Sequence, residues 1–526
     1  MKKVLRNKEK KLKLTTLAFT LVELLAVIVI LAIVLIIAVP GVLSIINKTK
    51  DSSYESQLKI IKEAARTYVT TNTIVWRDDQ AIVNLMEMQE QGLLDRKILD
   101  PRNKTELAGI SVIVTKKGHQ MTYEIVYTDS SNSSYPVFGN AMIPIVYKEN
   151  KWVKADPRNE NQSWFDYTNQ QWANVATVTE DVRQTLLDAP VGTEVPMDKI
   201  NTMFTWIPRF KYKLFNVDGT VGPVANSNMT GDYQVMIEME GVRSKKSIGT
   251  QNGEWLTHPA FTFGGEELSG FWVGKFETGY DGTVVDVDTN NIVDSSKLLV
   301  KPNVSSWRYI NGATIFENIM AMTDNSIFGM TKEEDPHLTK NMEWGAMAYL
   351  AQSKYGRGND SGVEISSNVA SEYITGSGDY IHSSNQSTTG NISGVYDTSG
   401  GAWDLVFGVM EDATGTGVLG AMSRFDSSLL NQLAAEKKYV DTYSYATTYL
   451  DRSRGHLGDA TVEIGPFVQD KSSWYDDASA FVTTEYDGSW FARGGMILSN
   501  EKAGIMAFTS SSGAASAVTG FRISLI

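Results

Sequence analysis

One carboxylate stands beside the most apolar stretch of the chain. Glu23 is followed by sixteen uninterrupted apolar residues, 24–39. An unpaired carboxylate in hydrocarbon costs about 2.5 kcal/mol or more, so an acidic residue here favours a functional role in which a cationic group meets it. The alternative is a plain anchor helix whose carboxylate reaches the headgroup region or pairs locally.

The residues around Glu23 predict a membrane helix. A helix over residues 19–43 would measure roughly 37 Å, and a bilayer core is about 30 Å thick. Basic residues before a span stay in the cytoplasm. The sequence therefore predicts a single-pass membrane protein with a cytoplasmic N-terminus and with everything after about residue 45 outside the cell. The basic leader consists of Lys2, Lys3, Arg6, Lys8, Lys10, Lys11 and Lys13 with the residues between them.

The string AFTLVE at residues 18–23 resembles the processing site of type IV prepilins and pseudopilins, the class III signal peptides. The resemblance implies cleavage between Ala18 and Phe19 by a prepilin peptidase and N-methylation of the new Phe19 amine. It also implies that this amine pairs with Glu23 of a neighbouring pilin subunit during filament assembly. Pro40 stands where pilins commonly carry a helix-kinking proline. After the membrane stage, the expected location is an extracellular filament or the cell surface.

The composition of this 526-residue chain disfavours or excludes several classes of partner and of chemical site. Its net charge of −13 disfavours a nucleic-acid partner, because phosphate binding needs clustered lysine and arginine. The absence of cysteine excludes disulfides, thiolate metal sites and cysteine nucleophiles. No nucleophile with a base and no paired carboxylates can be placed, so neither an enzyme nor a cofactor is expected. No metal-ligand spacing joins the five histidines, His119, His258, His337, His382 and His456.

Calcium is the one metal that the sequence leaves open. Asp286, Asp288 and Asn290 imitate the start of a calcium-binding loop. Asn291, however, replaces the glycine of the turn, and Lys297 stands in the place of the closing glutamate. No metal site is therefore predicted, and calcium binding remains an alternative.

Four segments of the second half resemble, in order, the formylglycine-generating-enzyme type of C-type lectin fold. They are residues 341–349, 390–404, 493–495 and 520–522, of which the last two read RGG and GFR. Those enzymes use reactive cysteines and a copper ion held by thiolates, and this chain has no cysteine. The resemblance therefore implies the fold without its catalysis, and it leaves a binding surface as the expected function.

The same lectin-like domain also displays C-terminal segments that retroelements diversify, and residues 490–526 resemble that arrangement. Small and polar residues in loops on a rigid scaffold suit adaptable recognition. Ordinary loop filler is the alternative reading of these positions. The expected framework is Arg493, Gly494, Gly495, Ala503, Gly504, Ala507, Phe508, Gly520, Phe521 and Arg522. The expected ligand contacts, here called the candidate set, are Met496, Leu498, Ser499, Asn500, Glu501, Thr509, Ser510, Ser512, Ala514, Ser516 and Val518.

The expected fold class is α+β, with a long N-terminal pilin helix and a small antiparallel sheet, then a β module and a large C-type lectin-like (sulfatase-modifying-factor-like) domain. The local patterns predict a hairpin around Lys117 and Gly118, strands at 143–148, 204–207 and 271–276, a helix at 337–355 and a surface loop at 371–393. The predicted divisions are a leader at 1–18, a pilin-like domain at 19–130, a small β connecting module at 131–200 and a lectin-like ligand-binding domain at 201–526.

These features predict a minor type IV pilin or pseudopilin that displays a lectin-like domain for binding a protein or glycan, which is an adhesion function. A domain of this bulk on every subunit would crowd a helical fibre, so a minor position is favoured. Two alternatives stay open. One is a filament component for DNA uptake or secretion whose large domain is structural, and the other, less favoured, is an enzyme.

Overall fold

The chain forms two compact units, Met1–Thr128 (unit 1) and Asp129–Ile526 (unit 2). The computed structural model describes residues 50–526 with breaks, of which the longest are 102–109, 128–134, 215–234, 282–293 and 462–476. The predicted leader and membrane segment lie outside the described residues, and so do Ala18, Phe19, Glu23, Pro40 and the calcium-like residues Asp286, Asp288 and Asn290.

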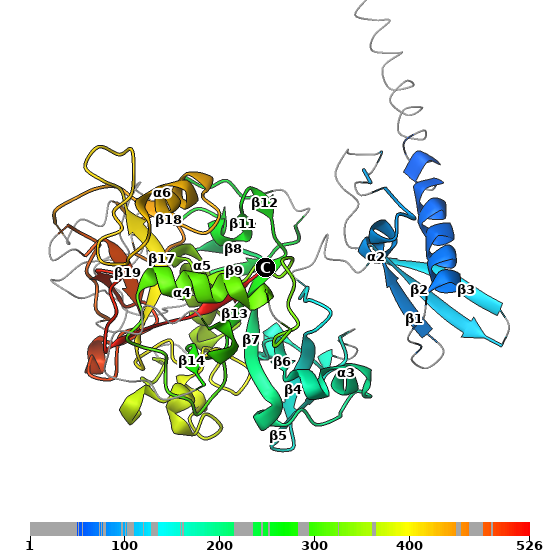
Figure 1. Ribbon diagram of the computed structural model, residues 1–526, viewed down its shortest axis with the longest axis horizontal. Helices are drawn as coiled ribbons and strands as arrows, with labels where there is room; N and C mark the ends of the chain where they lie inside the picture. Colours follow the sequence, from blue (N-terminus) through cyan, green and yellow to red (C-terminus); the bar gives the residue numbers. More distant parts are fainter. Residues whose placement is uncertain are drawn as a thin grey trace, which may run out of the picture. The chain divides into compact units, whose positions relative to one another are not determined.

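In unit 1 a helix packs on a three-stranded antiparallel sheet of order β1-β2-β3 (Figure 1). Ile61 and Ala65, four residues apart in the helical residues 56–71, share an apolar core with Val112 and Val114 of the sheet. The predicted hairpin is confirmed, since β2 and β3 pair along their whole length and Gly118 supplies a φ of +62° in the turn. The elements are β1 (Gln80–Asn84), α2 (Leu85–Glu90), β2 (Ile110–Lys117) and β3 (Gln120–Tyr127).

The predicted fold class, α+β with a long N-terminal pilin helix, is wrong for the described part of the chain. Apart from the helical residues 56–71, the α-helices there have between 6 and 11 residues. Strands, turns and irregular segments make up most of the remainder. The physical reason lies in the composition: 43 glycines and serine- and threonine-rich stretches weaken helices and favour turns, so paired strands supply most of the cores.

The predicted single-pass membrane localisation is corrected as well. Among the residues that the structure describes, no helix combines the length and the apolar character needed to cross a bilayer. The helical residues 56–71 illustrate the reason, because they carry Lys59, Glu63 and Arg66 on exposed positions. Charged side chains of this kind are costly in hydrocarbon.

The largest sheet of unit 2 is antiparallel and has seven strands in the order β16-β22-β13-β7-β6-β4-β5. β6 pairs with β7, so the two ranges that the sequence separated at residue 200 share one sheet. The predicted strand at 143–148 is confirmed, and 204–207 lies within a longer strand. The bounds are β4 (Ile143–Lys148), β5 (Lys151–Lys154), β6 (Asn174–Val178), β7 (Ile200–Pro208), β13 (Gly270–Gly274), β16 (His337–Leu338) and β22 (Ile523–Leu525).

A second, mixed sheet is built around β17 (Trp403–Met410). β19 runs antiparallel along one edge of β17, and β20 continues the sheet beyond β19. The first residues of β17 pair with β21 and its last residues pair with β18, both in parallel. The bounds are β18 (Asp441–Tyr443), β19 (Trp490–Arg493), β20 (Phe508–Ser511) and β21 (Thr519–Phe521).

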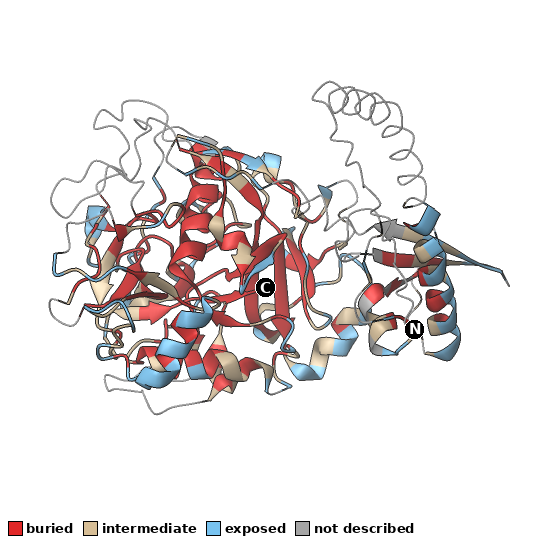
Figure 2. Ribbon diagram, turned by 90° about the horizontal axis from the view of Figure 1, so that it is seen from above, coloured by how far each residue is buried: buried red, intermediate tan, exposed pale blue. Residues whose placement is uncertain are grey.

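Helix α5 (Asn341–Ala351) lies in the interior of unit 2, and every one of its residues is buried (Figure 2). Its core includes Ile207 and Phe271 from the first sheet and Val406 and Phe491 from the second. The prediction of a longer helix at 337–355 with one apolar side is wrong, because a helix enclosed by protein needs no polar face and because its first predicted residues pair as β16. The other α-helices of unit 2 are α3 (Glu180–Asp188), α4 (Gly312–Met320) and α6 (Ser427–Glu436).

Residues 371–393 contain three short 3₁₀ turns, η8 (Ser371–Tyr373), η9 (Thr375–Gly378) and η10 (Ser384–Gln386). The segment is irregular as predicted, but Thr375, Tyr380 and Thr388 are buried, so it is only partly a surface loop. Small strand pairs and triplets complete unit 2: β8 (Phe210–Lys213), β9 (Met236–Met239), β10 (Leu256–Thr257), β11 (Thr262–Phe263), β12 (Glu266–Glu267), β14 (Gly279–Tyr280) and β15 (Leu298–Leu299).

Candidate functional site

The ten residues predicted as framework of the C-terminal segment are all buried. Two of the glycines show why the chain is constrained there. A Cβ on Gly495, whose φ is +85°, would lie 2.7 Å from the Cα of Ala503. A Cβ on Gly504 would lie 2.1 Å from the carboxylate oxygens of Asp477. Both positions therefore need glycine, since no side-chain carbon fits at those distances.

None of the eleven residues of the candidate set is fully buried. Leu498 is the most exposed apolar member, with 68% of its surface accessible. Asn500 and Glu501 are exposed beside it, and the other eight are partly exposed. The segment thus alternates between an interior framework and accessible positions, in the order in which the sequence places them.

The candidate set does not form a single patch. β19 and β20 are antiparallel, so the chain before β20 and the chain after β20 leave the sheet at opposite ends. Near the first end, Ile497 N donates to Gly401 O at 2.9 Å, and Trp403 N donates to Val518 O at 2.9 Å. At the other end, Met422 N donates to Ser512 O at 3.0 Å. Met496–Glu501 and Val518 therefore lie apart from Ser512.

Arg493 closes β19 and has no access to solvent. Its Nη1 donates to Asn341 Oδ1 at 3.2 Å and to Asp459 O at 3.3 Å. The guanidinium also lies over the rings of Trp344 and Phe508, at 5.8 and 5.5 Å from their centroids. Burial lowers the pKa of Arg493 to about 10, which still leaves it charged at neutral pH. Arg493 therefore anchors the start of residues 494–507. Because its side chain is enclosed, it cannot contact a ligand.

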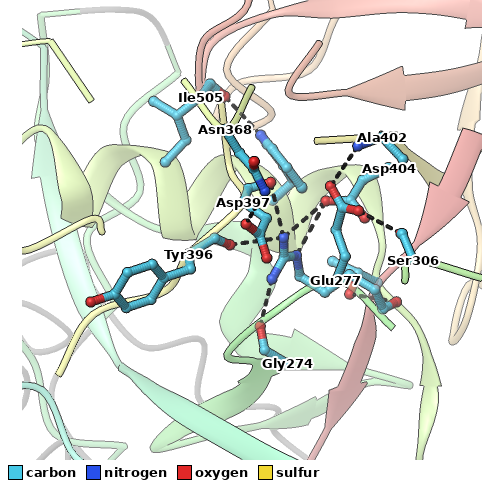
Figure 3. A network of polar contacts seen from close by, with 12 residues as sticks. Gly274, Glu277, Ser306, Asn368, Tyr396, Asp397, Ala402, Asp404 and Ile505 are labelled. Carbon is cyan, nitrogen blue, oxygen red and sulfur yellow. Dashed lines mark hydrogen bonds and ion pairs between the residues drawn. The ribbon is translucent and has the colours of Figure 1, made fainter. Parts of the chain in front are cut away.

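Arg522 is the centre of the second buried network, and its partners Gly274, Tyr396, Asp397 and Asp404 are labelled in Figure 3. Its Nε and Nη2 donate to Asp404 Oδ2 at 3.2 and 3.1 Å. Its Nη1 donates to Gly274 O at 2.8 Å, and its Nη2 also reaches the carbonyl oxygens of Tyr396 and Asp397. One side chain thereby ties β13, β17 and residues 396–397 to the end of the chain.

Three carboxyl groups surround this one guanidinium. Glu277 accepts hydrogen bonds from Ala402 N at 2.8 Å and from Ser306 Oγ at 2.5 Å (Figure 3). Burial, and then the carboxylates of Asp404 and Asp397, raise the pKa of Glu277 well above its usual range. Burial also raises the pKa of Asp404, to about 6. The cluster is enclosed, so none of its carboxyl groups is accessible from solvent.

A partly exposed stack beside the candidate set was missed by sequence reasoning. The guanidinium of Arg308 lies over the ring of Tyr373 at 4.1 Å and over that of Tyr309 at 5.5 Å. Its Nη1 donates to Ala517 O at 2.6 Å, and Tyr309 N donates to Ser516 O at 2.9 Å. Tyr309 and Tyr373 have φ of +58° and +57°, unusual values that cluster at functional sites. No periodic pattern in the sequence marks Arg308 and Tyr309 as a site. Tyr373 lies in a loop far from them along the chain, so the stack could not be predicted.

Each of the described histidines makes a hydrogen bond or an ion pair within the chain. His258 is enclosed, its Nε2 donates to Gly458 O at 2.8 Å, and burial lowers its pKa to about 3. His337 pairs with Glu343 at 2.8 Å, but Glu343 also accepts from Lys340 N at 3.0 Å and so caps α5. His382 is exposed and pairs with Asp379. Within the described residues no group of three or more histidine or acidic side chains could hold a metal ion.

Comparison with known proteins yields no relative. No protein-family model matches the chain, and no curated protein sequence matches it either. The pilin and lectin resemblances therefore rest on motifs of this chain alone.

Proposed function

We propose that this protein is a minor subunit of a type IV pilus or pseudopilus, and that its unit 2 binds a protein or glycan ligand through the members of the candidate set at residues 496–501. The observation that carries the binding proposal is the separation of roles in residues 490–526: the framework is buried, and every member of the candidate set is accessible. Accessible small and polar side chains on a rigid base suit recognition. The pilin proposal rests on the motif at residues 18–23.

The same separation supports diversification of the candidate set by a retroelement. Substitutions at Leu498, Asn500 or Glu501 would change the surface without disturbing the core, because these three side chains are exposed. A near-copy of the C-terminal coding segment beside a reverse transcriptase gene would support this proposal. The absence of such a copy next to the gene would count against it.

Binding is tested with the full chain on arrays of proteins and glycans. The triple variant Leu498→Ala, Asn500→Ala, Glu501→Ala should bind the captured ligand at least about tenfold more weakly, since a few well-placed contacts carry most binding energy. A matched triple on the exposed face of α6, Leu429→Ala, Gln432→Ala, Glu436→Ala, should bind as the parent does. Equal binding by all three proteins would contradict the assignment.

The filament role is tested separately by measuring the protein in sheared fibres. A minor subunit should be present at a small fraction of the main pilin, and Glu23→Ala should reduce its incorporation because the Phe19 amine then lacks its partner. Ala18 changed to a bulky residue should block processing. An amount equal to the main pilin, or normal incorporation of both variants, would argue against this role.

A further inference from the structure

A second candidate binding site lies away from residues 490–526, in a cavity of about 560 Å³. Three segments form its walls: the hairpin β4–β5, residues 162–174 and residues 381–393. No residue of the candidate set lines it. Its volume falls within the roughly 300–1,000 Å³ that ligand pockets occupy.

The cavity walls are held by hydrogen bonds between segments far apart in sequence. Ser393 Oγ accepts from Trp172 N at 2.9 Å and donates to Gln170 O at 3.1 Å. Asn391 Nδ2 donates to Gln170 O at 3.0 Å, and Asn174 Nδ2 donates to Ser393 O at 2.9 Å. Residues 162–174 and residues 381–393 are therefore fixed relative to each other before a ligand binds, which reduces the conformational entropy lost on binding.

Three tryptophans of the lining are also fixed in place. Trp152 Nε1 donates to Tyr380 Oη at 2.9 Å, Trp164 Nε1 to Asn174 O at 2.9 Å and Trp172 Nε1 to Tyr355 O at 2.7 Å. All three side chains are at least 96% buried. They line the cavity, and because their indole N–H groups are already bonded, hydrogen bonding with a ligand is left to other groups.

The lining is rich in amides and hydroxyls, and none of the described residues that line it is acidic. Lys148 is its single cation. This neutrality contrasts with the net charge of −13 of the whole chain. Neither a cationic ligand nor a multiply charged anion finds matching charges here, since desolvated charges need partners. A neutral ligand fits this lining.

Several lining groups have hydrogen-bonding capacity left over. The side chains of Gln162 and Ser384 make no hydrogen bond within the part of the chain that the structure describes, and Gln171 uses only its Nε2, which donates to Trp164 O at 2.9 Å. The hydroxyl of Tyr147 is buried without a partner, and burial raises its pKa, so it stays a neutral donor. Buried polar atoms normally have partners, so an unmatched one needs an explanation.

We infer that this cavity binds a neutral oligosaccharide. Amide side chains both donate and accept, as sugar hydroxyls do. Ile381 and Ile392 supply apolar contacts within the same lining, which suit the apolar faces of sugar rings. A peptide backbone also offers amides, but it has no array of adjacent hydroxyls to meet Gln162, Gln171, Ser384 and Tyr147 together.

The test titrates the full chain by calorimetry with maltotriose, cellotriose and triacetylchitotriose, alongside tetraglycine as the peptide comparator and 3′-sialyllactose as the charged one. At least one neutral trisaccharide should bind saturably, more tightly than either comparator. The double variant Gln162→Ala, Ser384→Ala should weaken that binding about fivefold or more, because each lost hydrogen bond weakens binding severalfold.

A matched double variant on α6, Ser428→Ala, Gln432→Ala, should leave saccharide binding unchanged, and so should the triple variant at Leu498, Asn500 and Glu501. This last control separates the cavity from the surface of the proposed function. Three results would overturn the inference: no binding of any neutral trisaccharide at about 10 mM, far above a millimolar dissociation constant; preference for tetraglycine or 3′-sialyllactose; or full affinity in the cavity double variant.

Discussion

Arg522 and Asp404 form an ion pair with no access to water: the side chains are 0% and 1% exposed and lie 3.1 Å apart. Breaking a buried pair by removing one partner costs about 3–5 kcal/mol, because the other charge is left without compensation. We expect Arg522→Met to lower the free energy of unfolding by about 3 kcal/mol, at the lower end of that range. Burial raises the pKa of Asp404 and Arg522 lowers it, so loss of the guanidinium favours uptake of a proton by Asp404.

Urea unfolding followed by tryptophan fluorescence measures this effect in unit 2, since every tryptophan except Trp76 lies there. The matched control is Lys151→Met, which removes the cation of an exposed pair with Glu194 at 3.4 Å. Exposed pairs contribute about 0–1 kcal/mol. Similar losses of unfolding free energy in both variants would show that burial of the Arg522–Asp404 pair does not determine its contribution to stability.

Glu277 gives the stability of unit 2 a definite dependence on pH. Its pKa in the folded protein is raised, first by burial and then by Asp404 and Asp397. A group with a raised pKa contributes full stability below its unfolded pKa, near 4.3, and loses it as pH rises, because the unfolded state then gives up the proton more readily. The loss approaches about 1.4 kcal/mol per pH unit in that window.

Glu277→Gln keeps the shape of the side chain and removes the titration. We therefore expect this variant to be more stable than the parent at pH 8 and nearly equal to it at pH 4, as measured by urea unfolding at both values. The control is Glu317→Gln, which changes an exposed carboxylate on α4 and should leave the pH profile unaltered. A variant that is less stable than the parent at pH 8 but equal to it at pH 4 would show instead that Glu277 is needed in its charged form. Equal losses at both pH values would show that the titration of Glu277 does not contribute.

Alanine substitutions at Gly495 and Gly415 distinguish the stability cost of backbone strain from the cost of steric crowding. Both have positive φ, +85° and +67°, but a Cβ on Gly495 would meet Ala503 at 2.7 Å whereas one on Gly415 meets nothing within 4 Å. Gly415→Ala should cost about 1 kcal/mol from backbone strain alone. Gly495→Ala should cost about 1–3 kcal/mol more, the range for overpacking. If both variants lose the same stability in thermal or urea unfolding, residues 494–507 can shift to accommodate the added Cβ at little cost.

The sequence predicted the local pattern of residues 490–526 better than the architecture that carries it. The resemblance of residues 490–526 to a diversified lectin-like segment implied which positions form the framework, and those positions are buried. Strand pairing between distant residues was not predictable in the same way: Asn174 opposite Thr205 places β6 beside β7 in the main sheet, and no local signal marks that pairing.

Other features were not predicted for the same reason, because they depend on contacts between segments that are far apart in the chain. Helix α5 has no polar face because protein surrounds it, so its ends could not be found from periodicity. The stack of Arg308 on Tyr373 and the cavity beside Ser393 join segments far apart in the chain. The predicted long helix failed in the described residues because strands and turns, favoured by glycine, serine and threonine, supply the cores.

Arg308 should control the mobility of the chain that follows β20. Its Nη1 donates to Ala517 O at 2.6 Å while its guanidinium lies 4.1 Å from the centroid of the Tyr373 ring. Arg308→Ala removes both contacts, so amide hydrogen exchange in residues 512–518 should accelerate by roughly fivefold to tenfold, the change expected when local opening becomes about 1–1.4 kcal/mol easier. Arg308→Lys keeps the charge without the planar group and should give an intermediate rate. The amides of α6 serve as the internal control, and exchange that rises there as much as in residues 512–518 would point to general destabilisation instead of a local tether.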